Sequence, residues 1–160
     1  MEEEIDSALT AEENARALAV KKARAIAAEV PEGIVIGADT IVVVDDVVLG
    51  KPADAADAAR MLGMLSGRTH TVHTGFALVE RPSGREESGV ESTRVTFRAI
   101  PEREIAAYVS TGGPLDKAGA YGIQDDYGAV FVARIEGCYY NVVGLPLSRV
   151  HAALEAFRGE

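Results

Sequence analysis

The sequence predicts an α/β fold in which a mixed sheet is flanked by helices. Helical and strand-like patterns alternate in the first half of the chain, and strand-like runs follow one another later. This order of elements is typical of a mixed α/β sheet. A length of 160 residues predicts one domain over residues 1–160, with enough chain to bury a real core.

The first helix is predicted by its start, its stripe and its end. Thr10 and Glu13 form a capping box, and Pro31-Glu32-Gly33 ends the helix. Its apolar stripe consists of Ala11, Ala15, Leu18, Ala19, Ile26, Ala27 and Val30. Lys22 falls inside this stripe, so it must either extend to water or meet a partner. The sequence alone leaves both readings of Lys22 open.

The remaining elements follow from turn signals and periodicity. Asp54 caps a second helix that closes near Gly67, a third helix spans about residues 101–110, and a last amphipathic helix follows Pro146. Further strands are predicted at residues 69–80 and 91–99, and residues 129–135 and 138–143 are predicted to pair as a hairpin. Residues 114–124 fit neither period and are predicted as a loop.

A carboxylate interrupts the most apolar part of the chain. The β-branched runs 34–36 and 41–44 predict two buried strand segments, separated by Gly37-Ala38-Asp39-Thr40. Burying an unpaired charge is expensive, so Asp39 should either sit at a strand end facing a cleft or meet a cation. Gly50-Lys51-Pro52 supplies a cation on a nearby bend.

Five polar residues are poorly explained by a solvated surface: Asp39, Lys51, Lys22, Lys117 and Gln124. Lysines neutralise phosphate oxygens, and a carboxylate can orient water or hold Mg²⁺. The amide of Gln124 offers both a donor and an acceptor, which suits recognition of a base edge. These residues suit a phosphorylated substrate, but no Walker A sequence, G-x-G-x-x-G or His/Cys metal spacing accompanies them.

Composition narrows the partners and the compartment. Lys and Arg number 16 and Asp and Glu 25, so the net charge of −9 argues against nucleic-acid and anionic-membrane binding. The single Cys138 excludes an internal disulfide and fits a reducing compartment, so a cytoplasmic location is expected. His70 and His73 are expected to be structural or surface residues.

Several motifs occur together and in order along nearly the whole chain. They are Ile36-Gly37-Ala38-Asp39-Thr40, Gly50-Lys51-Pro52, Leu65-Ser66-Gly67-Arg68, residues 116–124 and Val143-Gly144-Leu145-Pro146. This combination resembles the Maf family of nucleoside triphosphate pyrophosphatases, once described as septum-formation inhibitors. The Ala-Asp-Thr form with the Tyr-Gly-Ile-Gln loop is similar to the branch that hydrolyses dTTP and UTP.

The resemblance implies a fold, a reaction and a set of roles. The fold would be an elongated mixed α/β sheet with a deep cleft, related to the inosine triphosphate pyrophosphatases and often dimeric. The reaction would convert dTTP or UTP to the monophosphate and pyrophosphate with a divalent cation, Mg²⁺ or Mn²⁺. The implied roles are catalysis by Asp39, Lys51 and Lys22, substrate binding by Thr40, Gln124 and Lys117, and metal binding by Asp39 and Glu3.

One family motif has no counterpart in these residues. Family members open with a strand and a Ser-x-Ser-Pro-Arg-Arg loop, so the chain is predicted to be a Maf-like domain that is short at its N-terminus. We expect the absence to expose a sheet edge and to remove charge stabilisation of the transition state. It favours two alternatives: a catalytically impaired nucleotide-binding or regulatory protein linked to cell division, or an incomplete fragment that aggregates.

Overall fold

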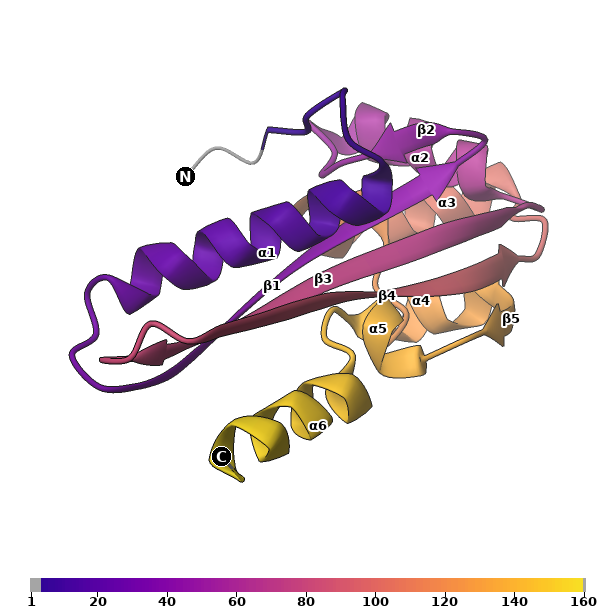
Figure 1. Ribbon diagram of the computed structural model, residues 1–160. Helices are drawn as coiled ribbons and strands as arrows, with labels where there is room; N and C mark the ends of the chain where they lie inside the picture. Colours follow the sequence, from indigo (N-terminus) through magenta and orange to yellow (C-terminus); the bar gives the residue numbers. More distant parts are fainter. Residues whose placement is uncertain (1–3, 160) are drawn as a thin grey trace. The chain divides into compact units, whose positions relative to one another are not determined.

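The computed structural model of the protein describes residues 4–159 and has the predicted α/β architecture (Figure 1). Its five-stranded sheet has the order β2-β1-β3-β4-β5, and the sheet is antiparallel rather than mixed. The strands are β1 (Gly33–Val44), β2 (Val47–Leu49), β3 (Thr69–Arg81), β4 (Glu86–Phe97) and β5 (Val132–Glu136). The α-helices are α1 (Ala11–Ala27), α2 (Ala55–Leu65), α3 (Glu102–Ser110), α4 (Asp126–Phe131), α5 (Tyr139–Val143) and α6 (Leu147–Arg158).

The chain divides into two compact units. Unit 1 contains the described residues up to Thr40, together with His73–Ser92 and the residues from Tyr140 onward. Unit 2 contains Ile41–Val72 and Thr93–Tyr139. Strands β1, β3 and β4 contribute residues to both units, and the single domain expected from the sequence stays a prediction.

In unit 1, helices α1 and α6 cover opposite faces of the sheet (Figure 1). One apolar cluster joins α1 to the sheet and consists of Ala19, Ala23, Ala27, Ala77 and Val79. The other joins α6 to the sheet and consists of Phe76, Leu78, Val150, Ala153 and Phe157. Successive side chains of a strand point to opposite faces, so alternate residues of β3 belong to the two clusters. Each face therefore has its own core.

Two glycines bring α1 unusually close to the sheet. A Cβ atom on Gly75 of β3 would lie 2.1 Å from the carbonyl oxygen of Ala15, and one on Gly37 of β1 would lie 2.6 Å from that of Ala19. Only glycine permits so close an approach of backbone to backbone. The position of α1 over β1 is therefore set by the absence of side chains at these two points.

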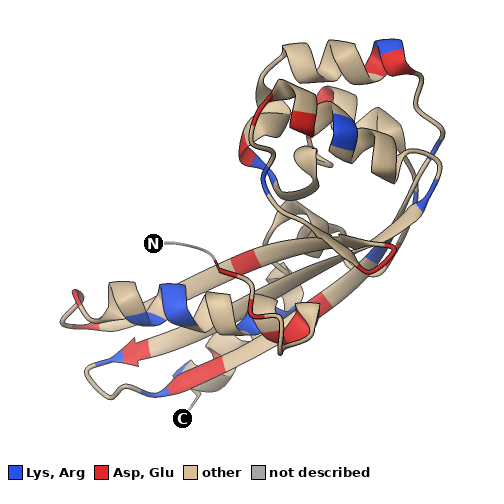
Figure 2. Ribbon diagram, turned by 90° about the horizontal axis from the view of Figure 1, so that it is seen from above, with Lys and Arg blue, Asp and Glu red and all other residues tan. Residues whose placement is uncertain are grey.

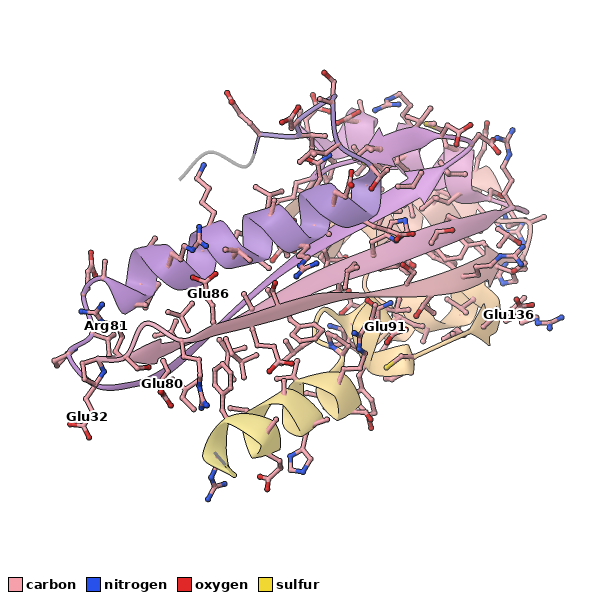
Figure 3. All side chains as sticks on the ribbon, viewed as in Figure 1. Glu32, Glu80, Arg81, Glu86, Glu91 and Glu136 are labelled. Atoms are coloured by element: carbon pink, nitrogen blue, oxygen red, sulfur yellow. The ribbon has the colours of Figure 1, made fainter. Side chains whose placement is uncertain are left out.

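The predicted start of α1 is confirmed. Thr10 and Glu13 form the capping box, with distances of 3.1 Å from Glu13 N to Thr10 Oγ1 and 2.7 Å from Thr10 N to Glu13 Oε2. The predicted stripe is wrong at Ile26, which is 55% exposed, whereas Ala23 is buried. Arg24 lies on the solvent side and pairs with Glu86, whose side chain points toward α1 in Figure 3.

Strand β1 departs from the prediction of two buried segments. It is one continuous strand of 12 residues, and Ile36 is 42% exposed instead of buried. The apolar run 34–36 was predicted to be buried, but β2 pairs only with Val42–Val44. The earlier part of β1 therefore lies at the edge of the sheet. Asp45 and Asp46 form the turn between β1 and β2, both with positive φ, as short hairpins favour.

In unit 2, helices α2 and α3 form where they were predicted, but the hairpin near the C-terminus does not. Asp54 caps α2 by accepting a hydrogen bond from Asp57 N, and Pro101 precedes α3. Residues 126–131 form α4, β5 pairs with β4, and residues 139–143 form α5. A short apolar run does not distinguish a strand from a helix by periodicity alone, and here the packing decides.

Within residues 4–159, no helix has both the length and the apolar character that crossing a bilayer requires.

The glycine contact predicts a sharp difference between two Gly→Ala variants. Gly75→Ala should destabilise the protein by about 3 kcal/mol or more, because the new methyl group meets the backbone of α1. Gly63→Ala is the matched control, since it lies within α2 with nothing within 4 Å of the added Cβ. That change should stabilise the protein by about 0.5–1 kcal/mol through helix propensity. Chemical denaturation measures both, and equal effects would contradict the close approach of α1.

Candidate active site

The most unusual interaction in unit 1 is an ion pair between α1 and β1. Lys22 Nζ lies 2.7 Å from Asp39 Oδ1, and the two side chains are 31% and 5% exposed. Asp39 lies in the middle of β1 and not at a strand end. Of the two environments expected for its carboxylate, the structure therefore shows contact with a cation. Of the two readings of Lys22, the structure gives the one with a partner. The ammonium offsets the cost of burying the carboxylate.

The side on which Asp39 lies follows from the strand period. Val35 and Gly37 both face α1, and Asp39 is the next residue in this alternation. Two ion pairs join basic residues of α1 to acidic residues of the sheet, Lys22 to Asp39 and Arg24 to Glu86; Figure 2 shows where residues of each charge lie along the ribbon. The sequence thus places a buried acid and a half-exposed base within hydrogen-bonding distance through an ordinary helix-on-sheet contact.

Thr40 faces the opposite side of β1 from Asp39. Its Oγ1 lies 2.9 Å from Thr74 Oγ1, and Thr74 in turn donates a hydrogen bond of 2.9 Å to the carbonyl oxygen of Asn141. A hydroxyl has one hydrogen, so Thr40 must be the donor to Thr74. The oxygen of Thr40 can therefore still accept a hydrogen bond. It lies near Gly144, since a Cβ atom built on that glycine would be 3.9 Å from Thr40 Oγ1.

The other predicted site residues, Lys51, Lys117 and Gln124, belong to unit 2. Lys51 is exposed in the bend between β2 and α2. The carbonyl of the preceding Gly50 accepts a hydrogen bond of 3.1 Å from Gly119 N, which ties this bend to the loop that carries the other two residues. Two motifs that lie far apart in the sequence are therefore joined through their glycines.

Lys117 is held by oxygen atoms of its own loop. Its Nζ lies 2.9 Å from Gly113 O, 3.3 Å from Asp116 Oδ1 and 3.4 Å from Asp125 Oδ2. The predicted loop contains two short 3₁₀ turns, Gly113–Asp116 and Ala118–Ala120. Gln124 is exposed and follows three buried residues, 121–123. The loop is thus anchored on both sides of its glycines, and the amide of Gln124 projects from a fixed backbone.

Two tyrosine hydroxyls anchor this loop, and sequence reasoning missed both. Tyr121 lies 2.6 Å from His70 Nε2, and Tyr108 accepts a hydrogen bond of 3.1 Å from Gly122 N. Tyr108 also donates one of 3.1 Å to Asp125 Oδ2. Burial raises the pKa of Tyr108 to about 12, with the Asp125 carboxylate acting in the same direction. No local signal could identify these contacts, because each joins segments remote in the sequence.

The histidines behave as expected for structural residues. His70 is buried among Phe97 and Tyr121, and burial lowers its pKa to about 4. His73 Nδ1 lies 2.7 Å from Ser92 Oγ and 3.9 Å from Glu12 Oε1. Burial lowers the pKa of His73, and the Glu12 carboxylate opposes this shift. Serine and acid both approach the same ring nitrogen, whereas a catalytic triad needs one on each.

The described residues suit a metal ion that is shared with a substrate. Within residues 4–159, no group of three His, Cys, Asp or Glu side chains converges to hold a cation, and the predicted ligand Glu3 lies outside the described residues. Mg²⁺ usually keeps several waters and binds one or two carboxylates plus substrate phosphates. Asp39, with Oδ1 already engaged by Lys22, fits that sparse mode of binding better than a protein cage.

The fold and the buried acid–base pair define an α/β protein whose sheet carries a candidate hydrolytic centre. The sequence profile of the Maf family, described as "Maf-like protein", matches residues 1–157, and the chain belongs to this family. A relative from Chlorobium luteolum, named "dTTP/UTP pyrophosphatase", is 50% identical over 157 residues, covering 96% of this chain and 80% of the relative. One of the same name from Moorella thermoacetica is 58% identical over 141 residues, covering 88% of this chain and 72% of the relative.

The burial of His70 predicts a specific loss of stability in acid. The unfolded chain binds this proton with a pKa near the ordinary 6.5, and the folded chain with a pKa of about 4. The stability due to the neutral ring is therefore complete above pH 6.5 and is lost as the pH falls from 6.5 to 4, by about 3 kcal/mol.

Chemical denaturation of wild type and His70→Phe across this range measures the effect. The variant should lose less stability than wild type as the pH falls, whereas His151→Asn, at an exposed position of α6, should follow wild type. Parallel curves for wild type and His70→Phe would contradict the assignment.

Proposed function

We propose that this chain hydrolyses dTTP and UTP to the nucleoside monophosphate and pyrophosphate. The observation that carries the proposal is the ion pair between Lys22 and the buried Asp39, because the family resemblance implies catalytic roles for these two residues. The names of relatives at 50% and 58% identity support the same substrates.

In the proposed reaction, the oxygen of a water molecule attacks the α-phosphorus. The bond between that phosphorus and the oxygen bridging to the β-phosphate breaks, and pyrophosphate leaves with the bonding electrons. Asp39 either orients the attacking water or accepts its proton. Lys22 holds the carboxylate in a fixed position at 2.7 Å, which limits the geometries that the water can adopt.

The lysines of unit 2 supply charge for the phosphates. Lys51 is exposed on its bend and can meet a phosphate oxygen without breaking any contact described above. Lys117 differs, because its ammonium already contacts three protein oxygens and must loosen one of these contacts to bind an anion. Both lysines are therefore proposed to bind phosphate, Lys51 directly and Lys117 only after it loosens a contact with the protein.

Base recognition is proposed for Gln124 and Thr40. Gln124 is exposed and offers both a donor and an acceptor. Thr40 offers its oxygen as an acceptor, which suits the N3–H of thymine or uracil, because its hydrogen is committed to Thr74. Since Asp39 and Thr40 face opposite sides of β1, one nucleotide can meet both only around the strand edge, where β2 pairs with Val42–Val44 alone.

A divalent cation, Mg²⁺ or Mn²⁺, is part of the proposal. Bound with the substrate, it would neutralise charge on the triphosphate oxygens. Asp39 is the carboxylate proposed to hold it, with Glu3 as the second ligand. We also propose a cytoplasmic location, supported by the single cysteine, and assembly as a homodimer. The net charge of −9 argues against binding of nucleic acids or anionic membranes.

The proposal is tested by pyrophosphate release from dTTP and UTP in the presence of Mg²⁺. Asp39→Asn should lower kcat by about 10²–10⁴-fold, the usual contribution of a positioned acid–base group. Asp46→Asn makes the same chemical change in an exposed turn and should retain the wild-type rate, because Asn tolerates positive φ. Chelation of divalent cations should stop turnover by the wild type.

Three outcomes separate the alternatives. Full activity of a folded Asp39→Asn variant would remove Asp39 from the chemistry. Nucleotide binding by the wild type without pyrophosphate release would identify a nucleotide-binding or regulatory protein instead of an enzyme. Turnover of other nucleotides with neither dTTP nor UTP accepted would reject the proposed substrates.

A further inference from the structure

A carboxylate lies beside the lysine that is proposed to bind phosphate. Asp125 Oδ2 is 3.4 Å from Lys117 Nζ, longer than the usual 2.7–2.9 Å of a charge-assisted hydrogen bond. A carboxylate so placed competes with phosphate for the same ammonium. Full pairing with Asp125 would lower the affinity of Lys117 for any anion that arrives from solution.

The same oxygen of Asp125 is engaged by a second group. Tyr108, from α3, donates a hydrogen bond of 3.1 Å to Oδ2, and the tyrosine is only 2% exposed. Its own oxygen accepts from Gly122 N at 3.1 Å, which fixes the hydroxyl relative to the loop. A buried phenol with a pKa of about 12 keeps its proton throughout the neutral range and stays a donor to the carboxylate.

The packing around Gly122 shows that the arrangement is tight. A Cβ atom at this position would lie 2.8 Å from Lys117 Cε and 2.9 Å from Asp125 Oδ2. The stem of the lysine and the carboxylate are both pressed against the glycine backbone, with Tyr108 on its N–H. Asp125 therefore approaches Lys117 from a position that the tyrosine restrains.

We propose that Tyr108 is a positioning residue for phosphate binding, which restrains the Asp125 carboxylate so that Lys117 stays available to a phosphate oxygen. The inference rests on the proposed role of Lys117 in binding the substrate phosphates. Loss of the hydroxyl frees Asp125 to close the remaining gap and to pair fully with the lysine. The binding of phosphate then weakens, although neither tyrosine nor aspartate touches the substrate.

Four variants of the full chain test the proposal: Tyr108→Phe, Asp125→Asn, the double variant, and Tyr127→Phe as an exposed tyrosine control on α4. The probes are inorganic pyrophosphate, by calorimetry, and dTTP, by steady-state kinetics. Tyr108→Phe should weaken pyrophosphate binding by about tenfold, the effect expected of one added charge-assisted contact on the lysine. It should raise KM for dTTP and leave kcat unchanged.

The double variant distinguishes positioning from simple support of the loop. Asparagine has no net charge to capture Lys117, so Tyr108→Phe/Asp125→Asn should recover wild-type affinity for pyrophosphate. Asp125→Asn alone should bind pyrophosphate at least as well as wild type, and this comparison remains decisive if Tyr108→Phe does not fold. Tyr127→Phe should not differ from wild type.

Each other result counts against the inference. A double variant as weak as Tyr108→Phe would show that the hydroxyl merely supports the loop through Gly122, and weaker binding by Asp125→Asn would show that Asp125 assists the lysine. If the wild type does not bind pyrophosphate, the role of Lys117 and this inference fall together. If the variants bind as predicted but dTTP is not hydrolysed, only the proposed activity fails.

Discussion

The structure of unit 1 depends on keeping a charged carboxylate inside a sheet. Asp39 is almost fully buried in the middle of β1, and the ammonium of Lys22 at 2.7 Å offsets the cost of burying its charge. The ammonium reaches it because α1 lies directly on the sheet over Gly37 and Gly75, where no side chains keep the backbones apart. A buried acid, a helix position and two glycines are thus one constraint. A change at any of them disturbs the others.

Unit 2 also fixes the position of a charged side chain, but through several oxygen atoms instead of one ion pair. Its proposed phosphate-binding lysine, Lys117, is surrounded by carbonyl and carboxylate oxygens, and these contacts fix its position but also neutralise it. The buried hydroxyl of Tyr108 restrains one of the two competing acids, Asp125, and holds the backbone at Gly122 at the same time. In both units, therefore, a charged group is fixed by a neighbour from a remote segment.

Local signals in the sequence predicted the parts of the fold that local physics decides. The capping box at Thr10 and the cap at Asp54 depend on residues three positions apart, and both form. The continuity of β1, the exposure of Ile36 and the loss of the predicted hairpin near residue 136 depend on which strands and helices pack together. The pairing of Lys22 was open from the sequence, because a stripe of residues shows which side a lysine faces but not what lies there. Tyr108 gave no signal at all, since its partners come from another segment.

Whether Lys22 makes a buried Asp39 possible can be measured by a double-mutant cycle on the free energy of unfolding. Lys22→Met and Asp39→Asn are made singly and together and are measured by urea denaturation at neutral pH. We expect the two effects to be strongly non-additive, with a coupling of about 2–3 kcal/mol, because removing either partner takes a counter-charge away from the other. Effects that add to within about 0.5 kcal/mol would show that the pair contributes nothing as a pair, and would contradict the account.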